Sequence, residues 1–366
     1  MSQCFCYSWR SFNPIFVILS WKTEKKSSIN LDPLVDMKVA VFSTSSYDEA
    51  FLSKHSTGHD IKFFKVSLSE ETFSLAAGYE AICIFVNDIL DKNILDKLKV
   101  LGLQLVVLRC AGFNNVDVRH ATKLGIPVLR VPAYSPEAVA EHAMALILTL
   151  NRKTHKAYNR VREGNFSLER LMGINLNQRK VAVIGTGHIG QAFCRILNGF
   201  GCQIKAYDPF PNQELQILGV KYGTLEETLK DADIVSLHCP LNADTQHLIN
   251  AERLSYIKHG AMLINTGRGG LIDTSAIISA LKTGMIGALG LDVYEQESEF
   301  FFQDFSESII QDEQLSQLIS FPNVLITGHQ GFLTHEALTE IAKVTFNNID
   351  AFKDGLALLN RIGINT

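Results

Sequence analysis

The stretch Lys180-Val-Ala-Val-Ile-Gly-Thr-Gly-His-Ile-Gly190 decides the fold. Its apolar run, residues 181–184, is typical of a strand that a parallel sheet buries on both faces. Gly185, Gly187 and Gly190 then give the spacing Gly-x-Gly-x-x-Gly. The first glycine permits a tight turn, the second lets the backbone approach a pyrophosphate, and the third lets a helix pack closely on the strand. The sequence therefore predicts a dinucleotide-binding strand, turn and helix.

An acidic residue follows the next predicted strand, Gln203-Ile-Lys-Ala-Tyr207, at position 208. A dinucleotide fold places a carboxylate at about this point, where it accepts hydrogen bonds from the adenosine ribose. Asp208 would also repel the 2′-phosphate of NADP, so we expect NAD as the cofactor. The alternative interpretation is that Asp208 is only a turn residue before Pro209.

Composition limits the classes of protein to which the chain can belong. Its 366 residues, 46% of them hydrophobic and 20% charged, suit a soluble protein of two domains. A net charge of −4 gives no basic footprint for nucleic acid. The seven cysteines are scattered, and Cys4-x-Cys6 is too close and isolated for a zinc site. We therefore expect a cytoplasmic protein with reduced thiols, no metal site, no nucleic-acid partner and no membrane span.

The first 36 residues differ from the rest of the chain. They hold one short apolar run, Ile15-Phe-Val-Ile-Leu19, followed by a polar stretch. Met37 then opens a clean strand, Lys38-Val-Ala-Val-Phe42. We expect Met37 to be the true start, and residues 1–36 to be a non-native or poorly ordered extension.

The remaining pattern alternates strands and helices, which favours an α/β fold. We predict two Rossmann-like domains with parallel sheets and a cleft between them. A flavodoxin-like substrate domain comprises 37–134 and 333–366, and the NAD-binding domain comprises 135–332. Ser135 and Pro136 begin a helix that crosses between the domains, and we expect His142 on it to be a satisfied core histidine. The predicted strands are 38–43, 60–66, 81–86, 105–109, 127–131, 203–207, 234–237, 261–265, 287–291 and 324–326.

A loop in the first domain, Arg109-Cys-Ala-Gly-Phe-Asn-Asn-Val-Asp117, follows a strand end, where ligands of open α/β sheets bind. Backbone N–H groups of Ala111 and Gly112 could point at a small anion. The same residues equally fit an ordinary turn into a helix that Asn115 or Asp117 caps. The residues alone leave both interpretations open.

Three polar residues, Arg268, Glu297 and His329, follow predicted strands of the second half. An arginine binds a carboxylate bidentately, a histidine transfers protons near neutral pH, and a carboxylate beside the histidine favours its charged form. With a nicotinamide, this set suits hydride exchange between 2-keto and 2-hydroxy acids. Taken singly, each residue also fits a structural or solvated role, and Glu295 and Glu299 compete with Glu297.

These motifs resemble the NAD-dependent D-2-hydroxyacid dehydrogenases. The resemblance rests on Gly-Thr-Gly-His-Ile-Gly, Asn-Thr-Gly-Arg-Gly, Asp-Val-Tyr-Glu-Gln-Glu and Thr-Gly-His-Gln, and covers the chain from about Met37. It implies that Arg268, Glu297 and His329 are catalytic, because Glu297 is the last residue of its motif. It also implies D stereochemistry, domain closure over the substrate, and a homodimer through the nucleotide domains, with a tetramer as the alternative. Residues 1–36 have no counterpart in the family pattern.

The segment Val131-Pro-Ala-Tyr-Ser-Pro-Glu-Ala-Val-Ala-Glu-His142 and the loop 297–304 most resemble the fermentative D-lactate dehydrogenases. In that branch Tyr134 and Phe332 would line a small substrate pocket, and Ala111 and Gly112 would hold the substrate carboxylate with Arg268. The resemblance thus implies reversible reduction of pyruvate by NADH. The predicted cofactor contacts are Gly185, Gly187, His188, Ile189, Gly190, Asp208, Cys239, Pro240, Thr266, Arg268 and Asp292.

Two alternatives to pyruvate reduction stay open. One is the same chemistry on a bulkier 2-keto acid, which the size of the pocket would decide. The other is a non-catalytic NAD(H)-sensing binding protein, against which the intact set of Arg268, Glu297 and His329 argues.

Overall fold

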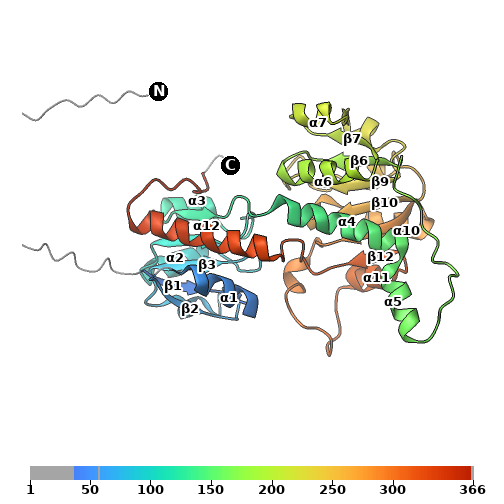
Figure 1. Ribbon diagram of the computed structural model, residues 1–366. Helices are drawn as coiled ribbons and strands as arrows, with labels where there is room; N and C mark the ends of the chain where they lie inside the picture. Colours follow the sequence, from blue (N-terminus) through green and yellow to red (C-terminus); the bar gives the residue numbers. More distant parts are fainter. Residues whose placement is uncertain (1–36, 57, 364–366) are drawn as a thin grey trace, which may run out of the picture. The chain divides into compact units, whose positions relative to one another are not determined.

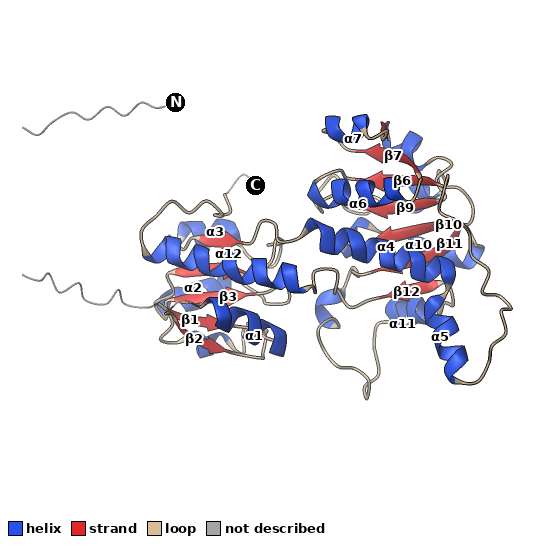
Figure 2. Cartoon of the chain, in the orientation of Figure 1, coloured by secondary structure: helices blue, strands red, loops and turns tan. Residues whose placement is uncertain are grey.

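The computed structural model describes residues 37–56 and 58–363. The extension predicted for residues 1–36 lies outside them. The described residues form two parallel β-sheets covered by helices (Figures 1 and 2). The predicted fold class, with two parallel α/β sheets, is therefore confirmed. Among residues 37–56 and 58–363, no helix is both long and apolar enough to span a membrane.

The first sheet has the strand order β2-β1-β3-β4-β5, and all its strands are parallel. This is the order of flavodoxin-like folds, in which the switch point lies between the first and third strands. Every residue of its central strands β3 and β4 is buried, as their apolar sequences require. The strands are β1 (Lys38–Val41), β2 (Asp60–Phe63), β3 (Ala81–Ile84), β4 (Leu105–Leu108) and β5 (Val128–Arg130).

Helices from both ends of the described chain cover this sheet. The last helix, α12, packs against α1 and β4, and its Phe346 and Ile349 join the core formed by β1 and β4 (Figure 1, red helix). Thr334 caps α12, because its side chain accepts a hydrogen bond from the backbone of Ala337. The helices are α1 (Ser46–His55), η1 (Phe73–Ala76), α2 (Lys92–Val100), α3 (Val118–Lys123) and α12 (His335–Lys353).

The second sheet has the order β12-β11-β10-β9-β6-β7-β8, again entirely parallel. The order reverses between β6 and β9, so a crevice opens there beyond the carboxyl ends of the strands. The strands are β6 (Lys180–Ile184), β7 (Gln203–Tyr207), β8 (Lys221–Tyr222), β9 (Ile234–Leu237), β10 (Ala261–Asn265), β11 (Ile286–Leu291) and β12 (Val324–Ile326).

The long helix α4 begins as predicted, with Ser135 as its cap and Pro136 in its first turn. It packs closely against α6 and β11, and a Cβ at Gly290 of β11 would lie only 3.2 Å from Leu150 and 3.3 Å from Leu146 of this helix. The helices of this part are α4 (Pro136–Arg152), α5 (Thr154–Arg162), α6 (His188–Gly199), α7 (Gln213–Ile217), α8 (Leu225–Leu229), α9 (Ala251–Leu254), η2 (Gly269–Leu271), α10 (Thr274–Thr283), η3 (Glu297–Glu299) and α11 (Glu313–Ser320).

Several strands are shorter than predicted. Strand β1 ends at Val41 rather than at residue 43, because Ser43 adopts a φ of 53° and turns the chain away. Strand β2 likewise ends at Phe63 rather than at residue 66. The two-residue strand β8 was not predicted, since so short a segment has no periodicity to detect.

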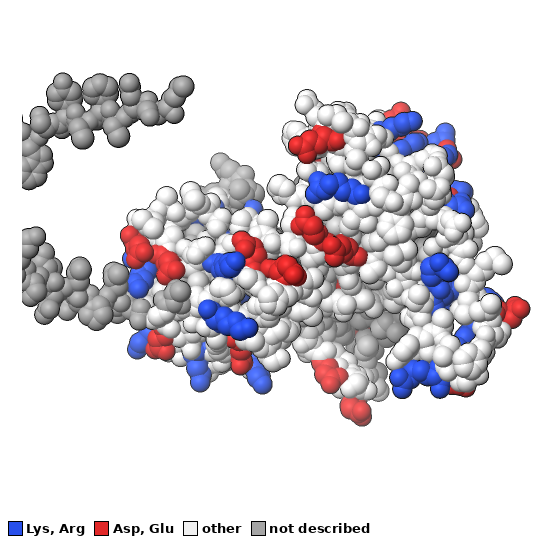
Figure 3. Space-filling model, in the orientation of Figure 1, with Lys and Arg blue, Asp and Glu red and all other residues white. Residues whose placement is uncertain are grey.

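On the face drawn in Figure 3, acidic and basic side chains are interspersed.

Candidate active site

The glycine turn after β6 has the shape that a dinucleotide requires. Gly185 has a φ of +94°, and a Cβ there would lie 2.5 Å from the backbone nitrogen of Cys239. A Cβ at Gly190 would lie 2.1 Å from the carbonyl oxygen of Gly185, so only glycine lets α6 pack this closely on the turn. At Gly187, by contrast, a Cβ would meet no atom of the described residues within 4 Å. The second glycine therefore leaves its backbone open to a ligand.

Helix α6 begins at His188 directly after this turn, and its cap residue Gly187 provides no side-chain hydrogen bond to the first turn. The N–H groups of that turn are thus available to an anion, which the helix dipole also favours. Gly187 and His188 line a small cavity of about 180 Å³ together with Ile189. These residues could hold the pyrophosphate of a dinucleotide.

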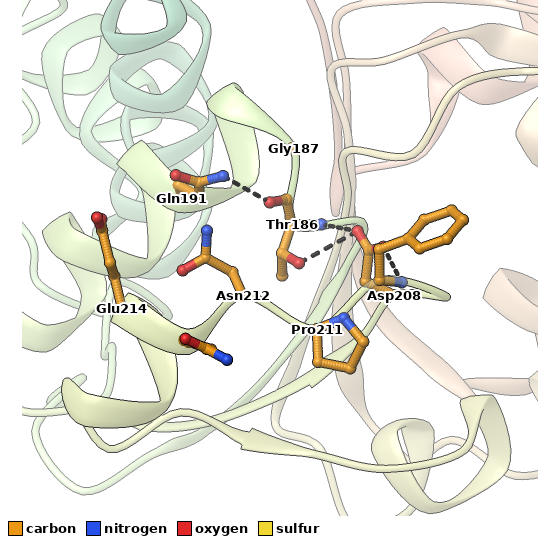
Figure 4. Close-up of a pocket in the computed structure, with 9 residues that line it drawn as sticks. Thr186, Gly187, Gln191, Asp208, Pro211, Asn212 and Glu214 are labelled. Atoms are coloured by element: carbon orange, nitrogen blue, oxygen red, sulfur yellow. Dashed lines mark hydrogen bonds between the residues drawn. The ribbon is translucent and has the colours of Figure 1, made fainter.

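A second cavity, of about 650 Å³, adjoins the end of β7. Asp208 lines it and accepts hydrogen bonds from the backbone nitrogen of Thr186 (2.6 Å) and from the backbone nitrogen of Phe210 (2.8 Å) (Figure 4). Asp208 therefore links the glycine turn to the next strand and still presents its carboxylate to the cavity. Phe210, which is 86% exposed, was not predicted as a site residue, although it lies only two positions after Asp208.

A third cavity, also of about 650 Å³, brings together residues from both sheets. The loop after β4 and the ends of β9, β10, β11 and β12 all contribute to its walls. The predicted residues that line it are Ala111, Gly112, Tyr134, Ile189, Cys239, Pro240, Thr266, Arg268, Asp292, His329 and Phe332. Gly185 and Gly190 lie in the glycine turn and do not line this cavity. Glu297 does not line it either, but it is hydrogen-bonded to His329, which does.

His329 and Glu297 form a hydrogen-bonded pair beside this cavity. The distance from Nδ1 of His329 to Oε1 of Glu297 is 3.0 Å, and Oε2 of Glu297 accepts from the backbone nitrogen of Tyr294 at 3.0 Å. Nε2 of His329 has no hydrogen-bond partner within the described part of the chain. The pair therefore fixes the ring and leaves one nitrogen for a ligand.

The backbone of His329 has a φ of 53°, a left-handed conformation that is uncommon for histidine. Its N–H donates to the carbonyl oxygen of Asp292 at 2.8 Å, which holds the turn in this shape. Strained residues of this kind cluster at functional sites because the surrounding structure must maintain them.

The neighbouring glutamate, Glu295, has other partners. One of its carboxylate oxygens lies 2.6 Å from Nε2 of His247, and the other accepts from the hydroxyl of Thr274 at 2.8 Å. Glu295 therefore ties the loop after β11 to the start of α10. The side chain of Glu299, the other competing glutamate, lies outside what the structure describes.

Asp292 lies 1% exposed at the end of β11 and lines the cavity. Burial alone would raise the pKa of its carboxyl group, but hydrogen bonds from His142 and Thr327 outweigh burial and lower it. His142 also lies 3.0 Å from the hydroxyl of Thr327, so its partners match the satisfied core histidine that we expected. Asp292 is thus an ionised anchor that joins α4 to the His329 turn.

Arg268 packs directly against Gly112 of the loop after β4. A Cβ at position 112 would lie 2.5 Å from Nη2 of Arg268, so only glycine admits the guanidinium here. Nη1 of Arg268 donates to the carbonyl oxygen of Gly267 at 2.7 Å. The predicted cap of the following helix is also present, since Asp117 accepts from the backbone of His120. The loop therefore both starts a helix and lines the cavity.

Aromatic side chains pack around the ring of His329. Phe332 lies with its ring centroid 6.4 Å from that of His329, and Phe302 lies 5.9 Å from it. Phe302 also contacts Phe85 of the first sheet, with ring centroids 5.3 Å apart. Burial raises the pKa of the Tyr134 phenol to about 12, so its hydroxyl stays protonated. Phe302 was not predicted, because nothing in its loop sequence shows which ring turns inward.

His238, at the end of β9, is a further cavity residue that the sequence did not single out. Desolvation lowers its pKa to about 3, and Nε2 lies 2.9 Å from the hydroxyl of Ser236. Its ring packs against Phe193 of α6, with centroids 4.8 Å apart. His238 is therefore a neutral wall of the crevice between β6 and β9, and it is not poised for proton transfer near neutral pH.

One buried hydroxyl in the cavity is unsatisfied by the protein. Oγ1 of Thr266, in a residue that is 6% exposed, has no partner among the described residues. Because buried polar groups are normally hydrogen-bonded, this oxygen is a candidate contact for a bound cofactor. Together with the open backbone at Gly187 and the carboxylate of Asp208, it shows that the residues present fit a dinucleotide.

Comparison with known proteins identifies the family of the chain. Residues 144–331 match the family described as D-isomer specific 2-hydroxyacid dehydrogenase, NAD binding domain. A relative from Escherichia coli, named D-lactate dehydrogenase, is 48% identical over 328 residues, covering 89% of this chain and 100% of the relative.

Two solved structures are similar over most of the chain. One was reported with the identification of the pyruvate reductase of Chlamydomonas reinhardtii, and it is 44% identical with a TM-score of 0.85, covering 89% of this chain and 99% of its own. The other is a D-lactate dehydrogenase from Aquifex aeolicus complexed with NAD and lactic acid, 35% identical with a TM-score of 0.78, covering 87% and 96%. The chain thus belongs to the D-isomer-specific 2-hydroxyacid dehydrogenases, and it is an NAD-dependent oxidoreductase.

Proposed function

We propose that the protein reversibly reduces pyruvate to D-lactate, with His329 as the acid and base, Glu297 as its partner and Arg268 as the substrate's carboxylate ligand. The observation that carries this proposal is the His329–Glu297 hydrogen bond of 3.0 Å beside a cavity that Arg268 and Gly112 also line. An acid, its orienting carboxylate and a carboxylate-binding cation thus border one space.

In the reduction, Nε2 of His329 donates a proton to the substrate carbonyl oxygen, and in the oxidation it takes the proton back. Glu297 accepts from Nδ1 of His329, which fixes the orientation and the tautomer of the ring and directs Nε2 toward the substrate. The planar fork of Arg268 binds the substrate carboxylate bidentately and polarises the neighbouring carbonyl. The N–H groups of Ala111 and Gly112 share the same carboxylate.

NAD, when bound, supplies or accepts the hydride. Gly187 and His188 would hold its pyrophosphate, Asp208 its adenosine ribose, and Thr266 and Asp292 would lie at its reactive end. Cys239 and Pro240 would cover it from the end of β9. The carboxylate of Asp208 favours NAD over NADP, because it would repel a 2′-phosphate.

The walls of the cavity favour a small substrate. Phe332 is 7% exposed and packs against Phe85, and Tyr134 lines the same cavity. Bulky side chains on the substrate would have to displace these rings. The E. coli and A. aeolicus relatives, whose names include lactate, support the same substrate class.

The proposal also concerns domains and assembly. Residues 37–134 with 333–366 would carry the substrate, residues 135–332 would carry NAD, and two chains would pair through their nucleotide domains. The segment after α5 supports pairing, because its apolar side chains Phe166, Leu168 and Met172 are 74%, 82% and 88% exposed. Sedimentation of the wild type and of Leu168→Asp tests this: a dimer that the substitution dissociates supports the pairing, whereas a wild-type monomer refutes it and a tetramer points to a second interface.

The test of the reaction is NADH oxidation by the purified protein across a panel of 2-keto acids, with chiral assignment of the product. Fast conversion of pyruvate to D-lactate is the expected result. Preference for a branched-chain or phenyl 2-keto acid would keep the roles of His329 and Arg268 but overturn the pocket assignment. Turnover of no acid, with NADH still bound, would leave a nucleotide-sensing protein as the explanation.

A further inference from the structure

A second arginine, Arg130, lines the same cavity as Arg268 and has no role in the reaction described above. It stands at the end of β5 and is half-buried. Nη1 of Arg130 donates to the carbonyl oxygen of Ala111 at 2.9 Å, and its guanidinium lies 5.1 Å from the ring centroid of Phe113. Its side chain therefore contacts the residues on either side of Gly112.

The backbone of Arg130 is held on both edges. It pairs with Leu108 of β4, its N–H donates to the carbonyl oxygen of Asn360, and its own carbonyl accepts from Nδ2 of Asn348 at 3.0 Å. The side chain thus extends from a fixed point in the sheet. A guanidinium placed this way can hold a loop more firmly than a mobile surface residue could.

The hydrogen bond to Ala111 has a geometric consequence at Gly112. In a trans peptide the carbonyl oxygen and the following N–H point in opposite directions within one plane. Holding the oxygen of Ala111 therefore also sets the direction of the Gly112 N–H. A charged donor on the oxygen further polarises the peptide and strengthens its N–H as a donor.

We infer that Arg130 is a positioning residue for the substrate carboxylate: it locks the Ala111–Gly112 peptide so that the Gly112 N–H, beside Arg268, meets the anion. This inference rests on the proposed function, since it concerns the binding of a 2-keto acid. Because the contacts of the Arg130 guanidinium are with this loop, at Ala111 and Phe113, we expect it to affect capture of the carboxylate more than the chemical step.

The experiment compares Arg130→Met, Arg130→Gln and Arg130→Lys with the control Arg119→Met, which removes an exposed arginine of α3. Each variant is assayed for the KM of pyruvate, for kcat, and for the dissociation constants of NADH and of oxamate, an isostere of pyruvate. We expect Arg130→Met to raise the pyruvate KM and the oxamate constant about tenfold, as the loss of a charge-assisted hydrogen bond implies. Its kcat should fall less than about threefold, and its NADH affinity should stay unchanged.

Arg130→Gln, which keeps a donor without the charge, should recover most of the oxamate affinity. If Arg130→Gln is as weak as Arg130→Met while Arg130→Lys is normal, the charge matters and not the peptide lock, and the inference is wrong. It is equally wrong if Arg130→Met behaves like Arg119→Met, or if NADH affinity and kcat fall together. A wild type that binds NADH but neither pyruvate nor oxamate would instead refute the proposed function.

Discussion

Gly112→Ala is expected to slow the reaction without unfolding the protein. A Cβ at this position would lie 2.5 Å from Nη2 of Arg268 and 3.3 Å from its Cζ. Favourable non-bonded contacts lie near 3.5 Å or beyond, so the guanidinium must retreat by about 1 Å. The fold should tolerate this, because the colliding atom ends a flexible side chain and Gly112 is not among the residues with positive φ.

The magnitude follows from the displacement. A misplacement of about 1 Å in a group that orients the substrate can cost on the order of 10²-fold in rate, or about 2.7 kcal/mol of transition-state stabilisation. We therefore expect kcat/KM for pyruvate to fall about 100-fold in Gly112→Ala. The free energy of unfolding should change by less than about 1 kcal/mol, and the NADH dissociation constant should not change.

Steady-state kinetics, NADH fluorescence titration and calorimetry measure these quantities. The matched control is Gly199→Ala at the end of α6, where a new Cβ meets no described atom within 4 Å. That control should keep its activity and its stability. A Gly112→Ala enzyme with kcat/KM within threefold of the wild type would refute the contact between Gly112 and a catalytically placed Arg268.

Three further outcomes follow from the site. His329→Gln should lower kcat by about 10³-fold with NADH binding intact, and near-normal turnover in rapid kinetics would remove His329 from proton transfer. Asp208→Ala should weaken NAD far more than NADP in binding titrations, whereas equal losses would argue against the ribose contact. Because the pKa of His238 falls to about 3 in the folded state, the unfolded state binds the extra proton between about pH 6.5 and pH 3. Acidification through that window should therefore reduce stability by up to about 1.4 kcal/mol per pH unit on this account, and His238→Phe should flatten the slope in denaturant titrations.

The parts of the fold that follow from local sequence could be predicted. Buried parallel strands are nearly continuous apolar runs, and the predicted positions of β4, β9 and β10 coincide closely with the observed strands. The glycine turn was predictable because Gly185 and Gly190 answer separate steric demands and Gly187 leaves its backbone open to a ligand. Strand ends were less predictable, since the end of β1 depends on the left-handed conformation of Ser43, which its side chain does not specify.

The catalytic candidates could be predicted only in part. His329 and Arg268 follow strands whose carboxyl ends must lie at one edge of a parallel sheet, so their proximity followed from topology. The choice between Glu295 and Glu297 depended on a family resemblance, because both residues lie in one irregular loop. Only the structure distinguishes them: the carboxylate of Glu297 accepts from the nitrogen of Tyr294 and lies beside the ring of His329, whereas Glu295 contacts His247.

Arg130 and Phe302 escaped prediction for a related reason. Arg130 looks like any polar residue at a strand end, and its link to Ala111 is visible only once β5 lies beside β4. Phe302 is one of three consecutive phenylalanines, and the sequence does not show that this residue adopts a φ of 67° or that its ring contacts Phe85 and His329. Long-range pairing and loop conformation, rather than residue type, decide both contacts.

The order of the strands arranges the candidate site residues along one edge of the second sheet. Asp208 follows β7, the glycine turn follows β6, and then β9, β10, β11 and β12 succeed one another along the edge. Arg268, Asp292 and His329 come directly after these last three strands. A dinucleotide whose ribose meets Asp208 and whose pyrophosphate meets Gly187 must extend its other end toward them. Under the proposed function, the reactive end of NAD and the proposed proton donor His329 would therefore meet on one side of the switch point.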